Sequence, residues 1–145
     1  MTERQRILGI DPGSRRTGFG IVDAGTRHAA YVASGAVRTA DGQFSERLRT
    51  IFASIAELVD EYQPAVIAIE DVFMARNAAS ALKLGHARAA AICATFQCDL
   101  EIHEYAPRAV KQAIVGTGGA SKLQVQHMVQ SLLRLDSPPA PDAAD

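Results

Sequence analysis

The chain has 145 residues and a formal net charge of −1, which predicts one domain of ordinary size with its own hydrophobic core. No apolar run reaches the ~18 residues that span a bilayer, so a membrane-spanning protein is excluded. The first residues lack the long apolar stretch of a secretion signal, and the two cysteines, Cys93 and Cys98, make no disulfide framework. We therefore expect a reduced, cytoplasmic protein with no membrane partner.

Basic residues are concentrated in one stretch of the chain. Residues 105–135 contain no Asp or Glu and carry Arg108, Lys111, Lys122 and Arg134. A basic face of this kind is the electrostatic footprint expected for a polyanionic partner such as nucleic acid. The alternative is a solvated helix face, and charge alone favours that alternative.

The first half of the chain predicts three strands, a helix and a fourth strand. Apolar residues at 6–11, 17–23 and 29–38, separated by short turns, predict an antiparallel meander. Helical spacing predicts a helix over 44–62, with Ser45 as its N-cap and Pro64 as its stop. Residues 65–70 are apolar up to Glu70, which is typical of a strand buried on both faces of a parallel sheet.

The second half predicts mainly helices. We expect an alanine-rich helix from 77 to about 96, a strand over 101–105, and a helix that begins at Pro107 and ends before Gly116. Ser121 and Gln124 have the spacing of a capping box at the start of a further helix, and Pro141 marks the start of another. This order predicts an α/β fold with a mixed sheet and helices on its faces, as a single domain over residues 1–145.

Asp11 and Glu70 each end an apolar strand and precede a loop. Sites in open α/β sheets form at the carboxyl ends of strands, and a helical crossover allows these two strands to be parallel neighbours. Two adjacent carboxylates repel one another unless a cation lies between them, and hard oxygen ligands select Mg²⁺ or Mn²⁺. The alternative is that each acid only caps a strand or forms a turn, and for either acid alone that alternative is favoured.

Asp142 and Asp145 are spaced so that they share one face of a helix. Together with Asp11 and Glu70 they would give four carboxylates, enough for a two-metal site that hydrolyses a phosphodiester. The alternative is that Asp142 is a favourable acid in a first helical turn and Asp145 belongs to a frayed end.

Three loops are candidates for contacts with phosphates or bases. Residues 9–18 resemble the phosphate-binding hairpin of actin-like ATPases, although that family needs two such lobes and a longer chain. The loop before Lys122 lacks the Gly and the Ser or Thr of a P-loop, but it ends at a helix N-terminus that suits a phosphate, or is a flexible connector. Phe73, in the loop after Glu70, could stack on an unpaired base, whereas core packing is the usual role of Phe.

Four runs of residues carry a resemblance to a known family. They are residues 8–14 (LGIDPGS), 68–77 (AIEDVFMARN), 80–85 (SALKLG) and 121–128 (SKLQVQHM). In register from residue 7 to residue 145, the sequence resembles the RuvC family of crossover junction endodeoxyribonucleases. The resemblance implies a ribonuclease H-like fold with a five-stranded mixed sheet. It also implies a homodimer that resolves Holliday junctions by symmetric paired nicks, in DNA recombination and repair.

The resemblance also implies a set of catalytic acids. The four acids of the family correspond to Asp11, Glu70, Asp142 and Asp145, which are expected to be the metal ligands as well. Two Mg²⁺ ions per active site are expected, with Mn²⁺ able to substitute.

DNA contacts and partners follow from the same resemblance. The family's catalytic, DNA-contacting lysines correspond to Lys111 and Lys122, and its base-stacking aromatic corresponds to Phe73. We include Arg76, in the same motif, as a further DNA-binding residue. The helix over about 77–96 corresponds to the family's dimer interface, and the RuvA–RuvB branch-migration complex is the expected partner on four-way junction DNA.

The sequence departs from the family at its C-terminus. The family's last helix continues beyond its second aspartate, whereas this sequence ends at Asp145, so we expect that helix to be truncated and the second metal to be held poorly. The main alternative function is therefore a catalytically impaired junction-binding protein. An actin-like nucleotide hydrolase is the other alternative, and chain length disfavours it.

Overall fold

A five-stranded mixed sheet forms the centre of the protein. The computed structural model describes residues 3–72, 77–116, 118–139 and 144. The strand order is β3-β2-β1-β4-β5. Pairing is antiparallel within β1–β2–β3 and parallel within β1–β4–β5, so the predicted mixed sheet is confirmed. The strands are β1 (Gln5–Asp11), β2 (Arg16–Ala24), β3 (Ala29–Arg38), β4 (Val66–Glu70) and β5 (Glu101–Tyr105).

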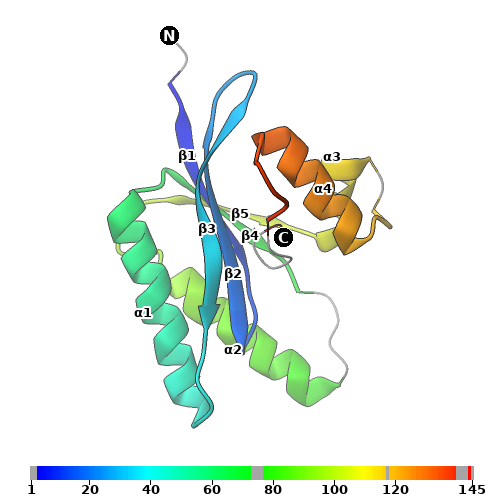
Figure 1. Ribbon diagram of the computed structural model, residues 1–145. Helices are drawn as coiled ribbons and strands as arrows, with labels where there is room; N and C mark the ends of the chain where they lie inside the picture. The colour runs from blue at the N-terminus through cyan, green and yellow to red at the C-terminus, as the bar shows by residue number, and fades with distance from the viewer. Residues whose placement is uncertain (1–2, 73–76, 117, 140–143, 145) are drawn as a thin grey trace.

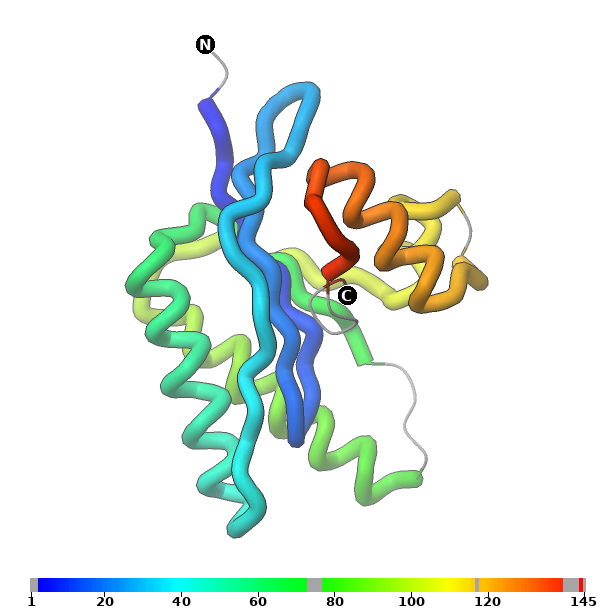
Figure 2. Tube along the Cα trace, viewed as in Figure 1, coloured from blue at the N-terminus to red at the C-terminus, as the bar shows by residue number. Residues whose placement is uncertain are grey.

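Helices cover both faces of this sheet (Figure 1). The helices are α1 (Phe44–Tyr62), α2 (Ala78–Cys93), α3 (Pro107–Val115) and α4 (Lys122–Leu133). Helices α1 and α2 lie on one side of the sheet, whereas α3 and α4 lie on the other (Figure 1). In the tube view β1 and β4 run in the same direction, so their carboxyl ends meet at one edge (Figure 2).

The core lies between the sheet and the pair α1 and α2. Leu8 and Ile67 of the central strands are fully buried, as is Ile55 of α1. On α2 the buried positions are Ala87 and Ala91, whose small side chains allow the helix to pack closely against α1. The alanine-rich composition therefore serves close packing. Within the described residues, no helix combines the length and the apolar character needed to cross a bilayer.

Sequence signals for helix caps predict one helix end correctly and another incorrectly. The predicted capping box is present, because Ser121 accepts from the Gln124 amide at 3.2 Å and the Gln124 side chain accepts from the Ser121 amide at 2.8 Å. The predicted N-cap of α1 is wrong. Gln43 occupies that position without a side-chain cap bond, and Ser45 lies inside the first turn.

The predicted end of α2 is also three residues late. Regular helix stops at Cys93, and the next residues form tighter turns in which the Thr95 and Phe96 amides donate to carbonyls three residues back. The Thr95 hydroxyl donates to the Ile92 carbonyl at 2.7 Å, which competes with continued helix. The predicted helix start at Pro141 lies outside the described residues.

Candidate active site

The sheet brings Asp11 and Glu70 to the same place. Ile10 pairs with Ile69 in the parallel register of β1 and β4, and Asp11 and Glu70 are the next residues on the two strands. Neighbouring strands lie about 4.8 Å apart, so the two residues are adjacent at the carboxyl edge. Both side chains are partly buried and line one cavity of about 210 Å³. Its other lining residues are Pro12, Asp71, Val72, Leu84 and Pro107.

A closed turn holds the backbone that follows Asp11. The Thr17 hydroxyl donates to the Gly13 carbonyl at 2.9 Å, and the Gly13 amide donates back to the same hydroxyl oxygen at 3.3 Å. Thr17 is fully buried, and Asp11 pairs with Gly18 across the hairpin. A Cβ at Gly13 would lie 2.1 Å from the Arg16 carbonyl oxygen, so only glycine fits this turn. The sequence therefore fixes the end of β1 through a glycine and a buried threonine.

The loop after Glu70 is held by contacts that the sequence did not predict. The Asp71 amide donates to the Tyr105 carbonyl at 2.7 Å, which extends the pairing of β4 with β5. Arg88 of α2 donates from Nε to the Glu70 carbonyl at 3.3 Å, and its Nη2 lies 3.7 Å from Asp71 Oδ1. The same Nη2 donates to the Glu104 carboxylate. Nothing in the local pattern around Arg88 marks it, because these contacts form only when α2 packs beside the two strands.

The basic stretch forms the α3–α4 pair on the opposite side of the sheet (Figure 1). Lys111 lies half-buried on α3, and Lys122 is the exposed first residue of α4. The loop between the helices passes close to α3, where a Cβ at Gly118 would lie 3.2 Å from Arg108 Nε. Among the described residues that line the Asp11–Glu70 cavity, α3 contributes Pro107, four residues before Lys111.

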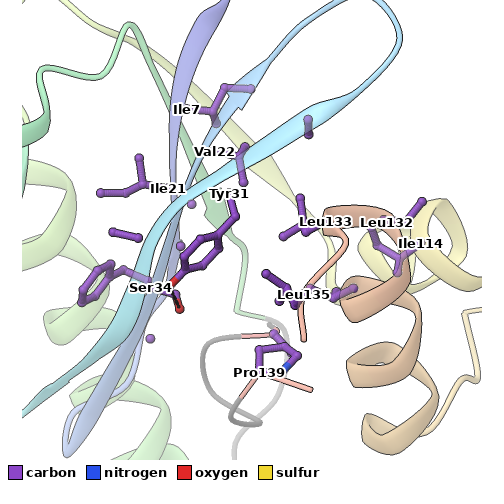
Figure 3. Close-up of a pocket in the computed structure, with 18 of the residues that line it drawn as sticks. Ile7, Ile21, Val22, Tyr31, Ser34, Ile114, Leu132, Leu133, Leu135 and Pro139 are labelled. Carbon is purple, nitrogen blue, oxygen red and sulfur yellow. Dashed lines mark hydrogen bonds between the residues drawn. The ribbon is translucent and has the colours of Figure 1, made fainter. Parts of the chain in front are cut away.

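A larger, mainly apolar cavity of about 430 Å³ lies between the sheet and α4. Figure 3 shows Val22 and Tyr31 of the sheet on one side, and Leu133, Leu135 and Pro139 on the other. Asp11 and Ala144 also line this cavity. Asp11 therefore borders both cavities, and Ala144, near the end of the chain, lines the larger one.

The donor set of the smaller cavity suits a hard divalent cation. Asp11 and Glu70 supply carboxylate oxygens, which Mg²⁺ and Mn²⁺ prefer over soft or nitrogen ligands. Within the described part of the chain, no group of three or more His, Cys, Asp or Glu residues forms a metal-binding cluster. Four of the predicted site residues lie outside the described residues, namely Phe73, Arg76, Asp142 and Asp145.

Comparison with known proteins gives consistent results. Residues 7–145 match the family model of crossover junction endodeoxyribonuclease RuvC. The crossover junction endodeoxyribonuclease RuvC of Vibrio campbellii is 55% identical over 139 residues, which cover 96% of this chain and 80% of the relative.

Solved structures of the same kind share the fold. Thermus thermophilus RuvC in complex with a Holliday junction substrate is 32% identical with a TM-score of 0.88, covering 97% of this chain and 86% of that one. The yeast mitochondrial Holliday junction resolvase Ydc2 has a TM-score of 0.68 at 16% identity, covers 92% of this chain and 63% of that chain, and shows a shared fold only. The ribonuclease H-like fold expected from the resemblance is thereby confirmed. On these matches in sequence and fold, the chain belongs to the RuvC family of crossover junction endodeoxyribonucleases.

Proposed function

We propose that this chain resolves four-way DNA junctions by metal-dependent phosphodiester hydrolysis, with Asp11 and Glu70 as metal ligands. Membership of an endodeoxyribonuclease family supports the reaction class, and the junction-bound Thermus relative supports the substrate. The observation that carries the assignment of residues is the shared cavity of Asp11 and Glu70 at the ends of adjacent parallel strands. An actin-like nucleotide hydrolase is disfavoured by the same family match.

Four carboxylates are proposed to hold the metal. Two of them, Asp11 and Glu70, line the smaller cavity, and we propose that Asp142 and Asp145 complete the ligand set. We propose two Mg²⁺ ions, with Mn²⁺ able to substitute, because the donors are hard oxygens. When bound, such ions activate water and stabilise the charge on the attacking and leaving oxygens at phosphorus. The protein's part is to hold the carboxylates of Asp11 and Glu70 in place on rigid strands.

The basic residues are proposed to position the DNA. Lys111 and Lys122 neutralise backbone phosphates near the scissile bond, while Phe73 stacks on an unpaired base and Arg76 contacts the strand beside it. Lys122 supports this role because it is exposed at the N-terminus of α4, where the helix dipole also favours a phosphate. Removal of one such phosphate contact should reduce the salt-dependence slope of junction binding by about one unit.

A homodimer is proposed as the functional unit, with the α2 face as its interface. Closed two-fold symmetry matches the symmetry of a four-way junction and places one site on each of two strands. Leu82 of α2 is 66% exposed and Phe96 just after it is 63% exposed, which supports an apolar interface there. The RuvA–RuvB complex is proposed as the partner that delivers junctions. The cytoplasmic location stays a prediction.

Cleavage of a synthetic four-way junction tests the proposal. The chain should give symmetric paired nicks in the junction with Mg²⁺ or Mn²⁺, and neither EDTA-treated samples nor linear duplex should be cut. Junction binding with no metal-dependent nicks would contradict the proposal and favour the impaired, junction-binding alternative.

Substitution of Asp11 tests the assignment of residues. Asp11→Asn should abolish nicking and leave junction binding within about twofold of wild type, because the change removes a metal ligand and no phosphate contact. Asp60→Asn, the same chemical change on the exposed end of α1, is the matched control and should cut normally. A folded Asp11→Asn protein that loses junction binding would contradict the assignment.

A further inference from the structure

Arg88 connects α2 to the carboxyl ends of two strands. Its side chain is 17% exposed, and its guanidinium reaches three acceptors. These are the Glu70 main-chain carbonyl at 3.3 Å, the Asp71 carboxylate at 3.7 Å, and the Glu104 carboxylate near the end of β5. Asp71 lines the same cavity as Asp11 and Glu70. One cation thus contacts the backbone of a proposed metal ligand and the side chain of the residue that follows it.

We propose that Arg88 is a positioning residue for the metal site: it fixes the end of β4 so that the Glu70 carboxylate is presented to the divalent ion in the correct geometry. The inference rests on the proposed role of Glu70 as a ligand. Its basis is the hydrogen bond to the Glu70 carbonyl, which joins residues 18 positions apart in sequence. Groups that support metal ligands typically change metal affinity or activity by about 10–100-fold when removed.

The planar guanidinium suits this task better than another cation. Its donors lie in a fixed fork, so that Nε donates to the Glu70 carbonyl while Nη2 donates to the Glu104 carboxylate and lies at ion-pair distance from Asp71. A lysine ammonium in the same place would keep the charge but lose the fork. A largely buried cation also needs its partners, so the packing of α2 and the placement of the β4 end depend on one another.

Positioning and simple electrostatics predict opposite results for metal affinity. A cation near the site repels a divalent ion, so if Arg88 acted only through its charge, its removal would strengthen metal binding. If Arg88 positions Glu70, its removal weakens metal binding despite the more negative site. Arg88→Lys separates the two effects further, because it preserves the charge and removes only the geometry.

Binding of Mn²⁺ to the full chain, followed through the electron paramagnetic resonance signal of the free ion, tests the proposal without cleavage. Arg88→Gln and Arg88→Lys should each weaken Mn²⁺ binding about tenfold. Added guanidinium chloride, below denaturing concentration, should restore part of the affinity of Arg88→Ala. Arg49→Gln is the matched control, because Arg49 is an exposed α1 residue paired only with Glu46 among the contacts described, and it should bind Mn²⁺ like wild type.

Junction assays provide the second measurement. The Arg88 variants should lower kcat and raise the Mg²⁺ concentration needed for cleavage, while their affinity for the junction in EDTA stays within about twofold of wild type, since the metal site and not DNA contact is altered. Each variant is assayed below its measured melting temperature, so that loss of folded protein does not contribute.

Three results would overturn the inference. They are unchanged or tighter Mn²⁺ binding by Arg88→Gln, wild-type behaviour of Arg88→Lys, and a loss of junction affinity without a change in metal affinity. Glu70→Gln, assayed alongside, distinguishes the two proposals. If Glu70→Gln binds Mn²⁺ as wild type does, the ligand role of Glu70 fails and the role of Arg88 fails with it. If Glu70→Gln is weakened and the Arg88 variants are not, only the role of Arg88 fails.

Discussion

Replacing Thr17 by valine tests how the end of β1 is held. Valine has nearly the shape of threonine and fills the same fully buried space, so the change removes the hydroxyl and little else. The lost contacts are the 2.9 Å bond to the Gly13 carbonyl and the 3.3 Å bond from the Gly13 amide. The perturbation is therefore confined to the turn that follows Asp11.

The expected cost follows from those two bonds. Each intramolecular hydrogen bond contributes about 0.5–1.5 kcal/mol net, and its loss costs more where the remaining partner stays away from water. Two bonds around a buried hydroxyl therefore give a loss of about 2 kcal/mol in the free energy of unfolding. For a chain of this length that corresponds to a fall of about 6 °C in melting temperature.

Thermal unfolding and junction cleavage measure the two consequences separately. At 25 °C Thr17→Val should remain folded, yet nick junctions more slowly than wild type, because Asp11 is no longer held by a closed turn. Thr17→Ser is the matched control: it keeps the hydroxyl, loses one methyl at a cost of about 1 kcal/mol, and should cut normally. A valine variant within about 0.5 kcal/mol of wild type, or a serine variant with equal loss of cleavage, would refute this reasoning.

Three further changes test the same turn and two other parts of the fold. Gly13→Ala should impair cleavage and lower the melting temperature, because its Cβ would lie 2.1 Å from the Arg16 carbonyl oxygen; normal cleavage by a fully stable variant would contradict that geometry. A hydrogen bond from Arg6 lowers the pKa of Asp23, so this carboxylate stabilises the fold above the unfolded pKa of about 3.9, and the contribution is lost as pH falls through the lower folded-state pKa. Wild type should therefore unfold at a higher urea concentration than Asp23→Asn at pH 7, and this difference should shrink as the pH falls below about 4. Ser121→Ala should destabilise α4 by about 1 kcal/mol, measured as faster amide exchange in its first turn, while Ser121→Asn should preserve the cap.

The regular elements could be predicted where local signals agree with the final packing. Helix α1 and strands β3 and β5 begin and end at the predicted residues, since periodicity and flanking breakers mark both ends. Ser45 shows the limit of such signals: serine favours an N-cap, but Phe44 already has helical conformation and packs its ring edge-on at 5.9 Å from His86 of α2. Helix α1 therefore begins earlier than the capping preference of Ser45 indicates, and its first residue, Phe44, contacts α2.

The residues of the candidate site also include some that local sequence signals predict and some that they do not. Asp11 and Glu70 could be predicted as neighbours because each ends an apolar strand, and a helical crossover favours parallel pairing. Arg88 could not be predicted, because its three acceptors come from the end of β4, the loop after it and β5, which meet it only in the folded chain. The role of Asp71 could not be predicted either. Its sequence position suggests only a loop acid, whereas the structure shows that it pairs with Arg88 and lines the cavity.

The position of the site follows from the change of strand direction at β1. This strand pairs antiparallel with β2 on one side and parallel with β4 on the other, so its carboxyl end adjoins both a tight hairpin and the end of a crossover strand. The hairpin, closed by Gly13 and Thr17, holds Asp11 from one side. The end of β4, fixed by Arg88, brings Glu70 from the other. Two separate sets of contacts, one within the hairpin and one from α2, thus hold the two carboxylates in place, and loosening either set should disturb metal binding while the sheet remains intact.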